Sequence, residues 1–238
     1  TIDCFRKMGV EINITDDEVI VEGVGLHGLE APSEALYTGN SGTTTRLLCG
    51  ILAGQPFTVT MSGDPSIQKR PMGRVMKPLR EMGASIEGKN DNFCPLTLFP
   101  SELHGIEYRL PVASAQLKSA ILLAGLYAEG QTTVIEPAPS RDHTERMFRA
   151  LGVEIETNGS TITLDPPEDL HAVDIAVPGD ISSAAFFLVA GAIIPGSELT
   201  IKNVGVNPTR TGILDVLRDM GADITESNFR DEAEPMCD

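Results

Sequence analysis

The residues best suited to chemistry lie in a loop rich in glycine and threonine, between Leu36 and Arg46. A short apolar segment runs into this loop, and a predicted helix with regularly spaced leucines follows it. Glycines at 39 and 42 let the backbone approach a ligand, and the free N–H groups that start a helix attract anions. No lysine follows the second glycine, so the loop does not match the G-x-x-x-x-G-K-[ST] nucleotide pattern. The loop therefore predicts an anion site, and an ordinary capped helix is the alternative.

The chain repeats this arrangement twice more. Small and hydroxyl residues precede three predicted helices, at 40–43, 113–116 and 179–183. A second helix in each repeat follows an arginine; these are Arg70, Arg141 and Arg210. If the repeats pack alike, the helix starts lie on one face, where dipoles and arginine forks suit phosphate and carboxylate groups. For any single serine, helix capping remains the commoner role.

A second repeated pattern, at the end of a predicted helix, marks where each repeat places its helices and strands. The pattern Arg-x-Met/Leu-Gly-x-x-Ile has its glycine at 83, 152 and 221, at equal intervals, and an earlier copy at 9. Each copy predicts a helix end, a glycine C-cap and a short strand. The second repeat predicts strands at 107–110, 132–136, 153–156 and 161–164, with helices at 115–128 and 142–151 and a turn at Asn158-Gly159. Asp142 and Glu145 are spaced as a capping box.

The predicted fold class is therefore α/β (α+β), built from β-α-β-α-β-β units. One unit runs from 35 to 98, a second follows it, and a third begins near Val173 and stops after Ile224. The first thirty residues match only the tail of an earlier unit. From this periodicity we expect the chain to be a fragment of a longer protein.

The amino-acid composition and net charge exclude several classes of partner and location. With 34 acidic and 18 basic residues among 238, the net charge is −16, which argues against nucleic acid or an anionic membrane as a partner. The longest apolar run, at 184–194, is too short to span a bilayer. Four scattered cysteines predict reduced thiols and a cytoplasmic protein. His143 and Glu145 could suggest a metal or acid/base pair, but no further ligand spacing supports it, and no metal site is expected.

Five segments together resemble one known family, 5-enolpyruvylshikimate-3-phosphate synthase of the bacterial type. The segments are Gly39-Asn-Ser-Gly-Thr-Thr-Thr-Arg-Leu47, Lys69-Arg-Pro-Met72, Pro111-Val-Ala-Ser-Ala-Gln-Leu-Lys-Ser-Ala120, Ser140-Arg-Asp-His-Thr-Glu-Arg-Met147 and Pro178-Gly-Asp-Ile-Ser-Ser-Ala-Ala185. The resemblance implies the enolpyruvyl transferase fold: two domains of three units each. It places a substrate-binding domain, incomplete at its N-terminus, at 1–177 and a partial second domain at 178–238.

The resemblance also implies a reaction. Such enzymes transfer the enolpyruvyl group of phosphoenolpyruvate to the 5-hydroxyl of shikimate 3-phosphate, by addition and elimination, on the route to chorismate and aromatic amino acids. No cofactor is involved, and the full-length protein is expected to be a monomer.

The resemblance also implies substrate-binding roles for specific residues of this sequence. Gly42 and Arg70 would contact phosphoenolpyruvate, with Asn40 and Thr43 shaping that pocket. Gly42 is also where a larger side chain would crowd glyphosate, which occupies the same pocket. Shikimate 3-phosphate would be held by Ser114, the backbone of Ala115, Gln116 (which reaches both substrates), Ser140 and Arg141. Asp180 lies at the implied crossover between domains and is expected to be structural.

Several family motifs have no equivalent in this sequence. The missing motifs are the Asp-Lys-Ser-x-x-x-Arg loop, the acid/base aspartate, the Lys-Glu-x-x-Arg segment, the Asp-His-Arg motif and the last lysine. No catalytic residue is therefore expected within the chain, and the chain alone is expected to be inactive.

Three alternatives stay open. The first is a fragment of the sister enzyme that acts on UDP-N-acetylglucosamine, although neither Cys49 nor Cys94 matches its reactive cysteine. The second is a non-catalytic module that binds anions, and the third is a repeat scaffold for protein partners.

Overall fold

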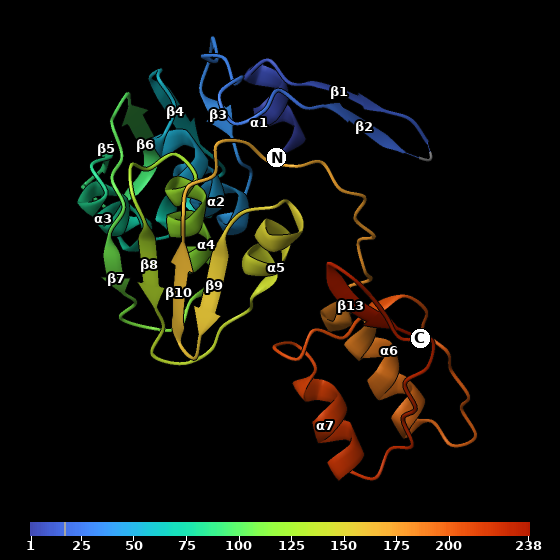
Figure 1. The fold of residues 1–238 in the computed structure, drawn as a ribbon. Helices are drawn as coiled ribbons and strands as arrows, with labels where there is room; N and C mark the ends of the chain where they lie inside the picture. Colours follow the sequence, from blue (N-terminus) through green and yellow to red (C-terminus); the bar gives the residue numbers. More distant parts are fainter. Residues whose placement is uncertain (17) are drawn as a thin grey trace. The chain divides into compact units, whose positions relative to one another are not determined.

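The computed structural model describes residues 1–16 and 18–238, and internal contacts divide the chain into two units (Figure 1). Unit 1 comprises Thr1–Ala138 and Gly152–His171, and unit 2 comprises Pro139–Leu151 and Ala172–Asp238. The domain boundary after Val177 stays a prediction.

The first repeat of unit 1 forms a four-stranded sheet in the order β3-β4-β6-β5. Its strands are β3 (Leu36–Tyr37), β4 (Val59–Ser62), β5 (Ser85–Lys89) and β6 (Phe93–Phe99). Strands β3 and β4 are parallel, so the chain needs a crossover between them, which α2 (Gly42–Ala53) supplies. The short helix η1 (Ile67–Lys69) and α3 (Gly73–Glu81) lead from β4 to β5.

The second repeat has the same topology. Its sheet order is β7-β8-β10-β9, from strands β7 (Glu107–Arg109), β8 (Thr132–Ile135), β9 (Ile155–Asn158) and β10 (Thr161–Leu164). Its helices are α4 (Ala115–Gly125) and α5 (His143–Ala150), of which α5 belongs to unit 2. The predicted β-α-β-α-β-β order is confirmed in both repeats. The predicted helix at 115–128 ends three residues early, and β9 begins two residues late.

Helices α2 and α4 form the centre of unit 1. Helix α2 packs against β4 and β6, α4 packs against β8, and the two helices contact each other extensively. Gly50 permits their close approach, because a Cβ there would lie 2.2 Å from the carbonyl oxygen of Ala120. The buried apolar side chains of these helices and sheets form one core, including Leu52, Met61 and Leu98.

The repeated helix ends behave as predicted. Gly9, Gly83, Gly152 and Gly221 all have positive φ, between 83° and 102°, which glycine adopts at little cost. The arginine three residues before the glycine has a clear role in the copies at Gly9 and Gly83, and Arg218 makes a longer bond of the same kind, its Nη2 donating to the Ile224 carbonyl oxygen at 3.4 Å. Arg6 Nε donates to the carbonyl oxygen of Ile12 at 3.0 Å, and Arg80 Nε donates to that of Ile86 at 3.0 Å. These bonds tie each helix end to the strand that follows it.

The N-terminal segment contains α1 (Ile2–Lys7) and the antiparallel pair β1 (Glu11–Ile14) and β2 (Val19–Glu22). This matches the predicted tail of a repeat.

Unit 2 is built around α6 (Ile181–Ile193) and α7 (Gly212–Asp219). A small sheet in the order β11-β13-β12 joins β11 (Val204–Gly205), β12 (Arg230–Glu232) and β13 (Glu234–Cys237). Ile181, Ala184, Val204 and Leu214 form its buried cluster. The strand predicted after Gly221 does not form: Ala222–Thr225 pairs with no other strand, and β13 is the strand that pairs with β11. Within the described ranges, no helix is both long and apolar enough to cross a membrane.

Candidate functional site

The start of α2 is organised by its loop residues. Ser41 caps the helix, its Oγ accepting from the Thr44 N–H at 3.1 Å. Gly39 has a φ of 60°, which lets the chain turn sharply before the cap. The Thr45 hydroxyl donates back to the Ser41 carbonyl at 2.8 Å. Asn40 and Thr43 are exposed at this helix start.

Gly42 lies beneath two guanidinium groups. A Cβ added at this buried glycine would meet Arg46 Nη1 at 2.7 Å and Arg70 Nη1 at 3.1 Å. Arg46 lies one turn along α2, on the same helix face as Gly42, and Arg70 follows η1. The sequence thus brings together a helix N-terminus and two cations at a position where any added side chain would push the arginine ends aside.

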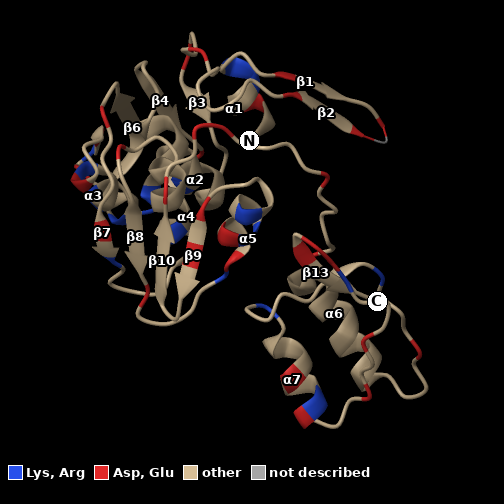
Figure 2. Ribbon diagram, viewed as in Figure 1, with Lys and Arg blue, Asp and Glu red and all other residues tan. Residues whose placement is uncertain are grey.

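Among the described residues, these arginines have no carboxylate partner. In the part of the chain that the structure describes, neither Arg46 nor Arg70 forms an ion pair, although the chain has 34 acidic residues spread over both units (Figure 2). Burial lowers the pKa of Arg46, and the charges of Arg70 and Arg74 lower it further. Unneutralised cations at close quarters favour a bound anion.

Gln116 joins this site to the start of α4. Its Nε2 donates to Thr43 Oγ1 at 2.7 Å, and its Oε1 accepts from Arg46 Nη1 at 2.8 Å. Ser114 caps α4, accepting from the Leu117 N–H at 3.4 Å, which confirms its predicted capping role. The positive ends of α2 and α4 therefore meet at one place.

The structure brings together the predicted residues of unit 1: Asn40, Gly42, Thr43, Arg70, Ser114, Ala115 and Gln116. Arg46 was missing from that predicted set, although the sequence contained a signal, its position four residues after Gly42 on a helix.

Ser140 and Arg141 belong to unit 2, just before α5. Arg141 is exposed and, among residues 1–16 and 18–238, forms no ion pair. The predicted capping box is wrong, because Asp142 makes no side-chain bond to the backbone of α5. Its carboxylate accepts from Asn207 Nδ2 at 2.6 Å and from Arg146 Nε at 3.0 Å instead. These bonds outweigh burial, so the pKa of Asp142 lies below its usual value.

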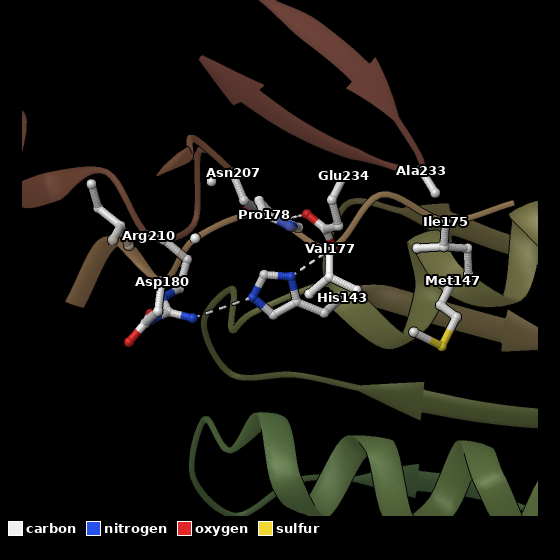
Figure 3. A pocket seen from close by; sticks show the side chains of 13 residues that line it. His143, Met147, Ile175, Val177, Pro178, Asp180, Asn207, Arg210, Ala233 and Glu234 are labelled. Atoms are coloured by element: carbon white, nitrogen blue, oxygen red, sulfur yellow. Dashed lines mark hydrogen bonds and ion pairs between the residues drawn. The ribbon is translucent and has the colours of Figure 1, made fainter. Parts of the chain in front are cut away.

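A cavity of about 270 Å³ also lies within unit 2 (Figure 3). Among its lining residues are His143, Met147, Val177, Asp180, Arg210 and Glu234. Asp180 caps α6, accepting from the Ser182 N–H at 3.2 Å, and pairs with Arg210 at 2.8 Å, as its expected structural role requires. His143 pairs with Glu234 at 2.6 Å rather than with Glu145. No cluster of three metal-binding side chains occurs among the described residues.

The cysteines offer no exposed nucleophile in the described structure. Cys4, Cys49, Cys94 and Cys237 are free and buried. Burial raises the pKa of Cys49 to about 12, so its thiol is protonated at neutral pH. The burial of all four described cysteines counts against the UDP-N-acetylglucosamine alternative, which requires a reactive cysteine.

The fold and this site define a class: a protein of β-α-β-α-β-β repeats whose helix starts and arginines concentrate positive charge at one place. A family model described as EPSP synthase (3-phosphoshikimate 1-carboxyvinyltransferase) matches residues 1–237. The chain therefore belongs to the EPSP synthase family.

Individual relatives agree with this assignment. The chain is 60% identical to 3-phosphoshikimate 1-carboxyvinyltransferase of Geobacillus thermodenitrificans over 240 residues, covering 100% of the chain and 56% of that protein. It is 57% identical to the Bacillus cytotoxicus protein of the same name, with the same coverage of each chain. A solved EPSP synthase from Acinetobacter baumannii superposes with a TM-score of 0.93 and 51% identity, covering 99% of this chain and 54% of the solved one. The chain thus spans about half the length of the relatives it matches.

Proposed function

We propose that this chain forms part of an enzyme that transfers the enolpyruvyl group of phosphoenolpyruvate to the 5-hydroxyl of shikimate 3-phosphate. The observation that carries the proposal is the pair of unneutralised guanidinium groups, Arg46 and Arg70, above Gly42 at the start of α2. Both substrates are polyanions, and bringing two of them together requires positive charge fixed in advance. The relatives, which are named 3-phosphoshikimate 1-carboxyvinyltransferases, support the same activity.

Phosphoenolpyruvate is assigned to the α2 side of the site. Its phosphate and carboxylate suit the guanidinium forks of Arg70 and Arg46, which bind such groups through paired hydrogen bonds. Gly42 leaves the space, while Asn40 and Thr43 shape the pocket. Glyphosate, also an anion, is assigned to the same place.

Shikimate 3-phosphate is assigned to the start of α4. The Ser114 hydroxyl accepts from its own helix and so keeps its O–H free to donate to an anion. The backbone N–H of Ala115 is one of the unpaired donors at a helix start. Gln116 reaches both substrates, because it already contacts Thr43 and Arg46. Ser140 and Arg141, which belong to unit 2, are assigned to the phosphate of the same substrate from the family pattern alone.

Calorimetric titration of the 238-residue chain tests this assignment. Arg70→Ala should lower the affinity for phosphoenolpyruvate by about tenfold or more, as expected for the loss of charged hydrogen bonds. Arg109→Ala is the matched control, since Arg109 is an exposed arginine of unit 1 that pairs only with Glu107 among the described residues. Equal effects of the two variants would contradict the assignment, and saturable binding would count against a pure protein scaffold.

Turnover is a separate measurement. The chain lacks the family's acid/base aspartate and several cationic motifs, so we expect the 238-residue polypeptide alone to bind its ligands without forming product. Product release followed by phosphorus NMR checks this, and sustained turnover by the sequence-verified polypeptide would refute it.

We also propose a cytoplasmic location and a monomeric state for the whole protein. Four free, buried cysteines among the described residues support the first. Size-exclusion chromatography with light scattering tests the second.

A further inference from the structure

The start of α5 is held from outside the helix. Asp142 occupies the N-cap position, yet its carboxylate does not bond to the helix backbone. Asn207, 65 residues away in the chain, donates to Asp142 Oδ1 at 2.6 Å. The helix start therefore depends on a residue of the β11–α7 loop.

Both the oxygen and the nitrogen of the Asn207 side-chain amide form hydrogen bonds within unit 2. The residue is only 2% exposed, so its polar atoms must be paired within the protein. Its Oδ1 accepts from the N–H and the hydroxyl of Thr209, at 2.9 and 2.6 Å. Its Nδ2 donates to Glu234 Oε2 at 3.1 Å as well as to Asp142. One buried side chain thus links three segments of unit 2.

Glu234 makes a second connection to α5. Its Oε1 lies 2.6 Å from His143 Nδ1, while His143 Nε2 faces Arg210 Nη1 at 3.5 Å (Figure 3). A proton on Nδ1 can be donated to Glu234, and Nε2 faces the Arg210 donor. Arg210 in turn bonds Asp180 at the start of α6.

We propose that Asn207 and Glu234 are positioning residues that hold the Ser140–Arg141 segment in place for the phosphate of shikimate 3-phosphate. The proposal rests on the function proposed above. The two residues that they anchor, Asp142 and His143, directly follow Arg141 in the chain. Displacing this anchor moves the exposed guanidinium of Arg141, and misplaced groups lose affinity without any change in charge.

Titration of the 238-residue chain with each substrate tests the proposal. Asn207→Leu retains the side-chain volume but removes the donor and the acceptor. It should weaken shikimate 3-phosphate binding by about tenfold and leave phosphoenolpyruvate affinity unchanged, whereas general loss of structure would weaken both. Because Asn207 acts through Arg141, the double variant with Arg141→Ala should bind no more weakly than Arg141→Ala alone.

Glu234 provides a second variant if Asn207→Leu fails to fold. Glu234→Ala should weaken shikimate 3-phosphate binding, and Glu234→Gln, whose single acceptor oxygen can keep only one of the bonds from His143 and Asn207, should restore part of it. The control is Arg218→Ala, which removes the bonds of Arg218 to Glu226 and to the Ile224 carbonyl elsewhere in unit 2 and should leave shikimate 3-phosphate affinity unchanged.

The outcomes separate this proposal from the proposed function. Unchanged shikimate 3-phosphate affinity in Asn207→Leu and Glu234→Ala, with binding lost in Arg141→Ala, would overturn the positioning role alone. Unchanged affinity in Arg141→Ala would overturn the substrate assignment, and the positioning role with it. Amide NMR signals of Ser140 and Arg141 in the ligand-free Asn207→Leu chain should shift, and unchanged signals would overturn the anchor directly.

Discussion

At the scale of single residues, the site at the start of α2 depends on Gly42, because glycine has no side chain. Gly42 leaves room for two guanidinium groups, and the atoms that a Cβ would meet are the ends of flexible arginine side chains. Those ends can move aside, so a substitution here acts on the site more than on the fold.

Gly42→Ala should therefore retain stability and weaken phosphoenolpyruvate binding by about tenfold, because Arg46 and Arg70 lose their shared position. Calorimetry and thermal unfolding of the same samples measure the two effects. Gly212→Ala is the control, since Gly212 is also the first residue of a helix but has no atom within 4 Å of an added Cβ. Strong destabilisation by Gly42→Ala would contradict this account.

Asp142 gives unit 2 an acid-sensitive contact. Its pKa is lowered in the folded state, because bonds from Asn207 and Arg146 outweigh the effect of burial. The stabilisation is complete above the ordinary aspartate pKa, about 3.9, and is lost as pH falls through the lower folded value.

We expect the stability of unit 2 to decrease below about pH 4 for this reason. Asp142→Asn should lower stability at pH 7 and flatten the pH dependence, as measured by denaturant unfolding across pH. Asp215→Asn, at an exposed position on α7, should change neither quantity. A pH profile that Asp142→Asn leaves unaltered would rule out this contact as the cause.

At the scale of elements, close contact between α2 and α4 brings the two helix starts together. Gly50 lies against the backbone of Ala120, and backbone cannot move aside as a side chain can. Helix α4 is also held by a buried ion pair, in which Lys118 Nζ lies 2.9 Å from Glu136 Oε2. Buried pairs of this kind are costly to break on one side.

Gly50→Ala should destabilise unit 1 by about 1–3 kcal/mol or more, since overpacking forces the helices apart. It should also weaken the binding of both substrates, because Gln116 then separates from Thr43 and Arg46. Gly191→Ala in α6 is the control: its added Cβ makes only ordinary contacts at 3.6 Å or more, so a small gain in stability of about 0.5–1 kcal/mol is expected. Chemical denaturation compares the two.

At the scale of the whole molecule, the two units differ in how much apolar surface they bury. Helix α6 is almost entirely apolar, yet Ile181 and Ala184 are its only buried residues. Phe186 is 80% exposed and Phe187 is 62% exposed. Unit 1, in contrast, surrounds α2 and α4 with two sheets.

Amide hydrogens of α6 and α7 should therefore exchange with solvent faster than those of α2 and α4, because fewer buried contacts oppose local opening. Hydrogen exchange followed by mass spectrometry measures this difference. Equal protection in all four helices would contradict it.

The sequence by itself determined the features that depend on neighbours along the chain. Glycines at helix ends, the cap at Ser114 and the order of strands and helices follow from local conformational preference and spacing. The five motifs also pointed to the family without any structure. Local pattern failed where packing decides: the strand expected after Gly221 pairs with no other strand, and Asp142 bonds Asn207 instead of capping α5.

Only the tertiary structure decided which distant side chains meet. Arg46 joins Gln116 across 70 positions, and Asn207 joins Asp142 across 65. Lys118 is buried although lysine is usually exposed. Such contacts depend on how helices and sheets pack in three dimensions, and no pattern within a short window encodes that. The sequence predicted an anion site at the glycine loop that starts α2, but the pair of arginines above Gly42 appeared only in the fold.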